Sequence, residues 1–253
     1  MNAIRVIEVY PQLLGTYADR GNALALRQRA GARGLRVDLH VVRPGESVPL
    51  DGDLYLLGGG EDAAQALAAS MLQTDGGLAR AVERGRTVLA VCAGMQILGT
   101  TFVGPDGAVL TGLGLVDAEA TALVSRATGD IVTRAQLDGE ALTLVGFENH
   151  RIGSRLGSAC RPLGRVERGR GNHDTDGTEG LVQGSIVATY LHGPLLALNP
   201  QLADVLLRRV AGALPALDTA HDDWAHTARA VRLREGNAGG LRRLAGLLRV
   251  RQR

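Results

Sequence analysis

One cysteine stands where a nucleophile can be exposed. Cys92 follows the apolar run Thr87–Val91 and precedes Met95–Leu98, a segment that can begin a helix. An apolar run without alternation predicts a buried strand of a parallel sheet. A nucleophile at a sharp turn between a strand and a helix forms a nucleophile elbow, and the small residues Ala90 and Gly94 would relieve its crowding. The alternative is that Cys92 is a small residue of the core.

A histidine far along the chain can serve as the base. The β-rich run Gly184–Gly193 ends in His192, so any contact with Cys92 must come from the fold. A free thiol has a pKa of about 8.5 and is mostly protonated at neutral pH. A neighbouring imidazolium and a helix N-terminus both stabilise the thiolate, which makes the pair a workable nucleophile. The alternative is a hydrogen-bonded histidine at a strand end.

Three glycines follow a second apolar strand. Leu54–Leu57 precedes Gly58, Gly59 and Gly60. Glycines at the carboxyl end of a strand let backbone N–H groups approach a ligand closely. Acyl chemistry needs such donors, because negative charge develops on the former carbonyl oxygen. The alternative is a flexible turn between a strand and a helix.

In their order and spacing, these segments resemble the class I (triad-type) glutamine amidotransferases, in the branch of cobyric acid synthase. Two further segments resemble signatures of the small subunits of lipid II isoglutaminyl synthases. The resemblance covers about residues 4–212. The segments that carry it are Tyr17-Ala18-Asp19-Arg20-Gly21-Asn22, Leu54-Tyr55-Leu56-Leu57-Gly58-Gly59-Gly60, Val91-Cys92-Ala93-Gly94-Met95-Gln96, Gly146-Phe147-Glu148-Asn149-His150 and Tyr190-Leu191-His192-Gly193.

The resemblance implies hydrolysis of glutamine. Cys92 would attack the side-chain amide and form a γ-glutamyl thioester with release of ammonia. His192 would take the thiol proton and deliver it to the leaving amine. The backbone N–H of Ala93 and that of Gly59 or Gly60 would hold the oxyanion.

The resemblance also implies contacts to the substrate and a third catalytic residue. Gln96 would touch the substrate, and Arg126 would pair with its α-carboxylate; Arg126 is otherwise a surface arginine. Many family members carry a glutamate two residues after the histidine, where this chain has Pro194. Asp19 is the first candidate for the third member, although it could cap a helix instead. Glu148 is the second candidate.

Two positions depart from the subfamily signatures. Glu61 follows the glycines where glutamine is usual, and Ala18 stands where the signature has glycine. Both departures change side chains next to predicted site residues. The first leaves the contacts of residue 61 open, and the second is a mild change.

Alternating strands and helices must position these residues. Their order predicts an α/β fold with a mostly parallel sheet and helices on both faces. The resemblance implies that this fold is flavodoxin-like. Ligands of such sheets bind at the carboxyl ends of the strands. Residues 104–136 and 153–184 are predicted as hairpins and loops. Predicted strands are Arg5–Val9, Arg36–Val42, Leu54–Leu57, Val88–Val91, Leu142–Phe147 and Ile186–Leu191; predicted helices are Ala23–Ala32, Ala63–Ser70, Leu78–Arg84, Met95–Leu98 and Gln201–Ala211.

The chain divides into a predicted glutaminase domain, residues 1–212, and a basic C-terminal helical extension, residues 213–253. Every basic residue counted in the chain is arginine, and the extension is rich in them. Leu241, Leu244, Ala245 and Leu248 recur at helical spacing, which predicts a basic amphipathic helix. This helix could dock on its own domain, on a partner subunit or on an anionic membrane surface. Nucleic-acid binding is disfavoured because aromatic residues do not interleave with the arginines.

Composition indicates an enzyme of the cytoplasm. By resemblance, its partner and substrate would place it at the inner face of the membrane. The two cysteines do not form a disulfide framework, no secretory signal precedes the first strand, and no apolar stretch is long enough for a membrane helix. Short polar clusters such as Asn172-His173-Asp174 lack a second ligand set, so we expect no metal.

The expected partner is a synthetase. The chain has no lysine and no phosphate-binding loop of the Walker type, so no cofactor is expected in it. By resemblance, a Mur-ligase-like subunit would bind ATP and Mg²⁺ and amidate D-glutamate of lipid II. The alternatives are a glutaminase for another acceptor such as a corrinoid, a non-catalytic binding module, and a Cys hydrolase of the intracellular-protease-like superfamily.

Overall fold

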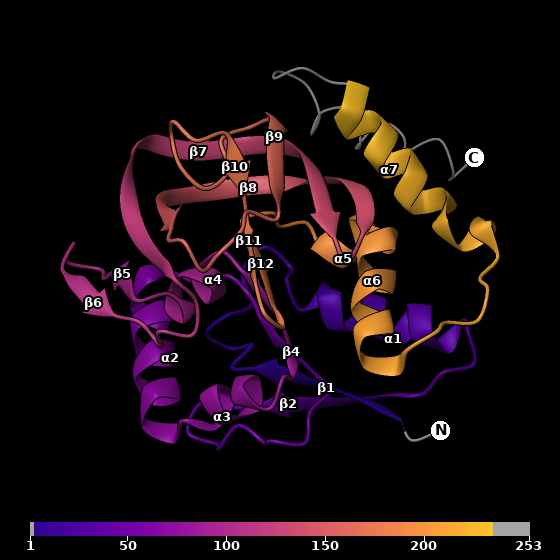
Figure 1. Cartoon of the computed structure of the whole chain (residues 1–253), viewed down its shortest axis with the longest axis horizontal. Coiled ribbons are helices and arrows are strands. Elements are labelled where there is room, and N and C mark those ends of the chain that lie inside the picture. Colours follow the sequence, from indigo (N-terminus) through magenta and orange to yellow (C-terminus); the bar gives the residue numbers. More distant parts are fainter. Residues whose placement is uncertain (1–2, 235–253) are drawn as a thin grey trace, which may run out of the picture.

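The central sheet is mostly parallel, as predicted. The computed structural model describes residues 3–234. Six strands lie in the order β11-β12-β4-β3-β1-β2, and all neighbours are parallel except β11 and β12 (Figure 1). The strands are β1 (Ile4–Val9), β2 (Val37–Val42), β3 (Leu54–Leu57), β4 (Thr87–Val91), β11 (Leu181–Gln183) and β12 (Ile186–Thr189).

Helices cover both faces of this sheet, as predicted. Tyr55 and Leu57 of β3 pack in one apolar cluster with α2, α3 and α4. Leu54 and Leu56, which point the other way, pack in a second cluster with α1, α5 and α6. Both sides are buried, which explains the uninterrupted apolar run. The helices are α1 (Gly21–Gly31), α2 (Asp62–Asp75), α3 (Gly77–Glu83), α4 (Ala93–Leu98), α5 (Leu195–Leu198) and α6 (Pro200–Ala211).

A second, largely antiparallel sheet stands beside the first, and sequence analysis did not predict it as a sheet. Its path is β10-β9-β7-β5-β6, with β8 paired to β7. The predicted strand Leu142–Phe147 is part of β8 and therefore lies in this sheet, not in the central one. Its strands are β5 (Thr101–Val103), β6 (Val109–Thr111), β7 (Ala118–Leu137), β8 (Glu140–Leu156), β9 (Gly164–Arg168) and β10 (Thr178–Glu179).

A two-residue turn connects the long strands β7 and β8. Leu137 pairs with Glu140, and Asp138 and Gly139 both have positive φ, +51° and +84°. Asp-Gly is a strong signal for such a hairpin turn. Asp138-Gly139 was therefore the sequence signal from which the pairing of β7 with β8 could have been predicted.

The chain after α6 crosses to the second sheet. A short 3₁₀ helix, η1 (Thr219–Asp222), leads into α7 (Asp223–Arg234), which contacts α5 and β8 (Figure 1). The predicted amphipathic helix around Leu241 and Leu248 lies outside the described residues, and the boundary at residue 212 stays a prediction. No helix within residues 3–234 is long and apolar enough to cross a membrane.

Arginine side chains hold α7. Arg229 donates from Nη1 to Asn199 Oδ1 at 2.7 Å and from Nη2 to the Thr143 carbonyl at 2.6 Å. Arg232 pairs with Asp130 of β7. The half-buried guanidinium of Arg229 therefore connects α7 to the start of β8 and to the end of α5.

We expect Arg229→Met to detach α7. The variant loses hydrogen bonds from a charged donor, each worth about 1.5–3 kcal/mol. Limited proteolysis should then cut the exposed connection, residues 212–218, faster than in the wild-type chain. Arg27→Met is the matched control, since Arg27 is exposed on α1 and has no polar contact within the described chain. Equal cleavage rates in both variants would contradict this role for Arg229.

Candidate active site

Cys92 lies at an elbow between β4 and α4. Its backbone has φ +52° and ψ −108°, outside the regions that a residue with a side chain favours. Such a conformation costs on the order of 1–3 kcal/mol and persists only where the surroundings fix it. The Cys92 N–H donates to the Thr189 carbonyl at 2.8 Å. A Cβ on Gly94 would lie 2.8 Å from Leu57 Cβ, so the turn requires glycine there.

His192 is in contact with Asp19. Its Nδ1 lies 3.0 Å from Asp19 Oδ2 and 3.2 Å from Oδ1, and both side chains are buried. Nε2 is buried and has no partner at hydrogen-bond geometry within residues 3–234. Burial lowers the pKa of His192, but Asp19 and the nearby Cys92 outweigh it and raise this pKa to about 10. The arrangement favours an imidazolium beside the thiol sulfur.

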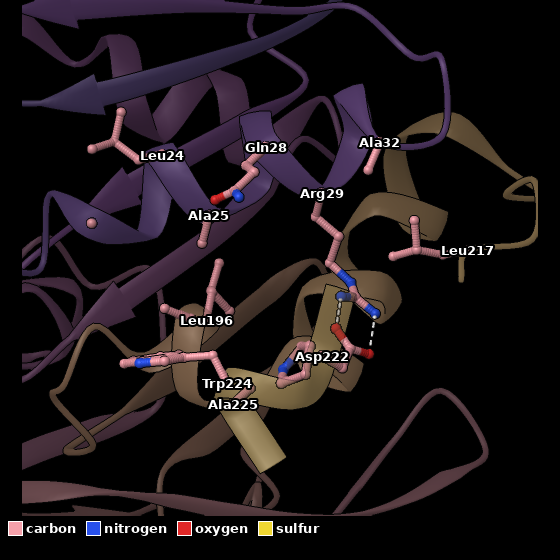
Figure 2. A pocket seen from close by; sticks show the side chains of 13 residues that line it. Leu24, Ala25, Gln28, Arg29, Ala32, Leu196, Leu217, Asp222, Trp224 and Ala225 are labelled. Atoms are coloured by element: carbon pink, nitrogen blue, oxygen red, sulfur yellow. Dashed lines mark hydrogen bonds and ion pairs between the residues drawn. The ribbon is translucent and has the colours of Figure 1, made fainter. Parts of the chain in front are cut away.

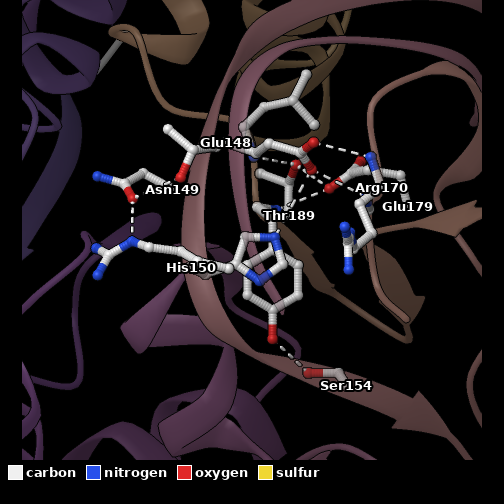
Figure 3. A network of polar contacts seen from close by, with 12 residues as sticks. Glu148, Asn149, His150, Ser154, Arg170, Glu179 and Thr189 are labelled. Carbon is white, nitrogen blue, oxygen red and sulfur yellow. Dashed lines mark hydrogen bonds and ion pairs between the residues drawn. The ribbon is translucent and has the colours of Figure 1, made fainter. Parts of the chain in front are cut away.

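Of the two candidates for the third residue, Asp19 is the one that contacts the histidine. The N-cap of α1 is Arg20, so the Asp19 side chain is directed to His192 and does not cap that helix. Glu148 instead accepts hydrogen bonds from the backbone N–H groups of Arg170 at 2.8 Å and Gly171 at 3.0 Å (Figure 3). Glu148 therefore fixes a loop of the second sheet.

The glycine run supplies a free donor, the Gly60 N–H, beside the elbow. The N–H of Gly59 donates to Asp19 Oδ2 at 2.8 Å, so it is not free to bind an oxyanion. The N–H groups of Gly60 and Ala93 have no partner within the described chain, and both residues line the cavity that contains Cys92. Residue 59 must still be glycine, because a Cβ there would lie 2.7 Å from His192 Cε1.

The cavity at the elbow has a volume of about 470 Å³. It lies between the carboxyl ends of the central strands and the second sheet, whose β7 and β8 supply one wall. Gln96 and Arg126, both predicted to contact the substrate, line it. This volume lies within the range of pockets that bind small molecules.

Gln96 is held by hydrogen bonds at the cavity wall. Its Oε1 accepts from Gln65 Nε2 at 2.9 Å, and its Nε2 donates to the Ile152 carbonyl at 3.0 Å and to the Tyr190 hydroxyl at 3.2 Å. Its amide is therefore fixed in orientation. Sequence analysis missed Gln65, which carried no motif.

Arg126 is anchored at the cavity by a chain of polar side chains. Its Nε donates to Asn149 Oδ1 at 2.6 Å, and Asn149 Nδ2 donates to the Tyr17 hydroxyl at 2.6 Å. The Tyr17 ring meets His192 edge-on, with ring centroids 4.8 Å apart. Tyr17 and Asn149 were not assigned roles from the sequence, although both belong to the two subfamily segments.

A second cavity, of about 380 Å³, lies between α1 and the C-terminal helices (Figure 2). Leu24, Leu196 and Trp224 line it, and the ion pair between Arg29 and Asp222 lies at one end. Its lining contains no Cys, Ser, Thr or His side chain. The cavity at Cys92 contains the elbow and lies at the carboxyl ends of the central strands, and it is the candidate active site.

We expect Ala18→Gly to stabilise the chain. Ala18 has φ +63°, and the left-handed region costs a residue with a Cβ about 1 kcal/mol or more. The urea midpoint should rise with an unchanged slope. Ala32→Gly is the control, since Ala32 has φ −62° and should gain nothing. A lower midpoint for Ala18→Gly would show that the alanine methyl makes contacts that outweigh the strain.

Known proteins share this sequence pattern. The family model described as the CobB/CobQ-like glutamine amidotransferase domain matches residues 5–200. Subunit GatD of the lipid II isoglutaminyl synthase (glutamine-hydrolyzing) of Staphylococcus aureus (strain N315) is 38% identical over 213 residues, which cover 83% of this chain and 85% of that protein. A cobyric acid synthase of Cereibacter sphaeroides is 34% identical over 162 residues, which cover 61% of this chain and 32% of that protein.

Solved structures share the fold. A crystal structure of a glutamine amidotransferase superposes with a TM-score of 0.52 at 18% identity, covering 81% of this chain and 98% of that one. The glutaminase domain of a Trypanosoma brucei CTPS has a TM-score of 0.52 at 12% identity, covering 85% and 97%. The family resemblance and the fold class are both confirmed. The chain belongs to the CobB/CobQ-like glutamine amidotransferases.

Proposed function

We propose that this chain is the glutaminase subunit of a lipid II isoglutaminyl synthase. It would hydrolyse L-glutamine and supply ammonia to a Mur-ligase-like, ATP-dependent partner that amidates D-glutamate of lipid II. The observation that carries the glutaminase assignment is the buried Asp19–His192 pair beside Cys92 at the elbow. The similarity to GatD over most of both chains supports the choice of acceptor.

The reaction proceeds by covalent catalysis in this proposal. Cys92 Sγ attacks the side-chain amide carbon, and the C–N bond breaks as His192 Nε2 delivers its proton to the leaving nitrogen. Ammonia leaves and a γ-glutamyl thioester remains. Water then attacks the thioester, His192 accepts the water proton, and glutamate departs with the thiol restored. Asp19 holds His192 in the tautomer and orientation that leave Nε2 toward the sulfur.

The oxyanion of each tetrahedral intermediate would bind the free N–H groups of Gly60 and Ala93. Arg126, held by Asn149, would pair with the α-carboxylate of glutamine. Gln96 would contact the substrate from the cavity wall. Glu61 also lines the cavity and has the charge that an α-ammonium group prefers.

A corrinoid acceptor is the second candidate, because cobyric acid synthases are also similar to this chain. This chain covers 85% of the Staphylococcus aureus GatD but only 32% of the Cereibacter sphaeroides cobyric acid synthase. The match over most of GatD favours lipid II. ATP and Mg²⁺ are assigned to the partner, which would also bring the subunit to the inner face of the membrane.

We expect Cys92→Ser to abolish glutamate release from L-glutamine. The hydroxyl of serine is a far weaker nucleophile at neutral pH, since only a small fraction of it ionises. Cys160→Ser is the matched control, because Cys160 is the other free cysteine and lies outside the cavity. Release should rise when a Mur-ligase-like neighbour is co-expressed. Glutamine left intact by both the wild-type chain and the complex would reject the assignment.

We expect Asp19→Asn to lower kcat by about 10²- to 10⁴-fold. Asp19 raises the pKa of His192, so its loss lowers this pKa, and the imidazolium that protonates the leaving amine is lost at lower pH. The alkaline limb of the kcat/KM profile should therefore move to lower pH. Asp53→Asn, a carboxylate at the opposite end of β3, is the control. An unshifted alkaline limb would contradict the pairing.

A further inference from the structure

The segment that carries His192 leaves the central sheet before it reaches the active site. β12 ends at Thr189, and the chain then runs through Tyr190 and Leu191 to His192. Backbone N–H groups that leave a sheet need new partners when they are buried. Tyr190, Leu191 and His192 are all buried. The hydrogen bonds of these three N–H groups therefore determine how rigidly the His192 imidazole is held.

One buried carboxylate bonds the first two of them. Glu179 Oε1 accepts from the Tyr190 N–H at 2.7 Å and from the Thr189 hydroxyl at 2.7 Å (Figure 3). Thr189 Oγ1 in turn accepts from the Leu191 N–H at 3.1 Å. Glu179 therefore fixes both residues before His192, one directly and one through the Thr189 hydroxyl.

The third N–H is bonded to the second sheet. His192 and Phe147 of β8 exchange backbone hydrogen bonds of 2.9 and 3.1 Å. Glu179 is itself on β10, which pairs with β9 in that sheet. The side chain of Thr189 and the N–H groups of Tyr190 and His192 are thus hydrogen-bonded to residues of the second sheet, although β12 belongs to the first.

The burial of the Glu179 carboxyl group is energetically unfavourable. Its side chain is fully buried, and Oε2 has no hydrogen-bond partner within residues 3–234. Burial raises the pKa of Glu179 to about 7, with a smaller contribution from the charge of Glu148, against the hydrogen bonds from Thr189 and Tyr190. An apolar side chain would avoid the cost of burying this acid. What the acid contributes is the pair of bonds to the His192 segment.

We propose that Glu179 is a positioning residue for His192, acting through the Tyr190 N–H and the Thr189 hydroxyl. This inference rests on the proposed glutaminase function for its catalytic consequence. Glu179 does not line the cavity, so its effect on substrate binding should be small. Its loss should let the imidazole move relative to Cys92 and Asp19, and a displacement of about 1 Å can lower a rate about 100-fold.

The test uses the full chain with the variants Glu179→Gln, Glu179→Leu and Thr189→Val. Thr133→Val is the matched control for Thr189→Val, because Thr133 is equally buried but its hydroxyl has no partner within the described chain. Two quantities are measured: kcat and KM for glutamate release, and the pH dependence of Cys92 alkylation by iodoacetamide. Mass spectrometry of the labelled peptides separates Cys92 from Cys160.

Glu179→Leu should lower kcat by about 10- to 100-fold with KM within about twofold. Its Cys92 alkylation profile should move to higher pH, because a displaced imidazolium stabilises the thiolate less. Thr189→Val should change both quantities in the same direction. Glu179→Gln keeps a carbonyl oxygen for the two bonds and should remain close to the wild type, as should Thr133→Val.

An alkylation profile that stays at the wild-type pH in Thr189→Val and in folded Glu179→Leu would overturn the proposal and leave Glu179 a role in stability alone. If Glu179→Leu does not fold, Thr189→Val decides. The measurement of Cys92 alkylation does not require glutamine, so it tests the position of His192 independently of glutaminase activity. If the wild-type chain releases no glutamate either alone or with its co-expressed neighbour, but the profile shifts in Thr189→Val and not in Thr133→Val, the proposed function is rejected and this inference is retained.

Discussion

The buried contact between Asp19 and His192 is the interaction on which the rest of the site depends. A carboxylate excluded from water must be paired and hydrogen-bonded to be tolerated. Asp19 meets that requirement with the imidazole and with the Gly59 N–H, so one side chain joins the loop before α1, the end of β3 and the end of β12. The proton affinity of His192 follows from the same contact.

Close backbone approach is the second constraint. Gly59 faces the imidazole and Gly94 faces β3, and in each place a Cβ would collide with a neighbour. The elbow and the histidine can occupy one small volume only because these two positions lack side chains. The strain at Cys92 is offset by the packing of β4 and α4 around it, where residues on both sides are buried.

The two sheets supply different parts of the cavity that contains Cys92. The central sheet supplies the nucleophile and the glycine turn at its carboxyl edge, as α/β folds commonly do. The second sheet supplies Arg126 and Asn149 and forms the opposite wall. It also holds the backbone of His192 through Phe147. The second sheet is thus part of the active site and not an appendage to it.

The sequence predicted the elements whose signal is local. Continuous apolar runs such as Leu54–Leu57 indicated the central strands, and small residues around Cys92 indicated the elbow. The long strands β7 and β8 were not predicted as part of a second sheet, because many of their side chains are exposed and they contain no continuous apolar run. The dipeptide Asp138-Gly139 was the local signal for the turn between them.

The sequence ranked Asp19 before Glu148 only through the resemblance, and the contact of Asp19 with His192 could not be predicted from the sequence. It depends on the path of the loop before α1, where Tyr17 and Ala18 adopt left-handed conformations that no residue type there requires. Bonding of the Gly59 N–H to Asp19, which removes one expected oxyanion donor, is likewise a product of that path.

The three residues of the site come from three distant parts of the chain, Asp19 before α1, Cys92 after β4 and His192 after β12. A nascent polypeptide that has emerged as far as α4 carries the thiol but neither the complete central sheet nor the imidazole. Such a chain cannot assemble the pair that activates the sulfur. Translation must therefore pass His192 before this pair can activate the sulfur.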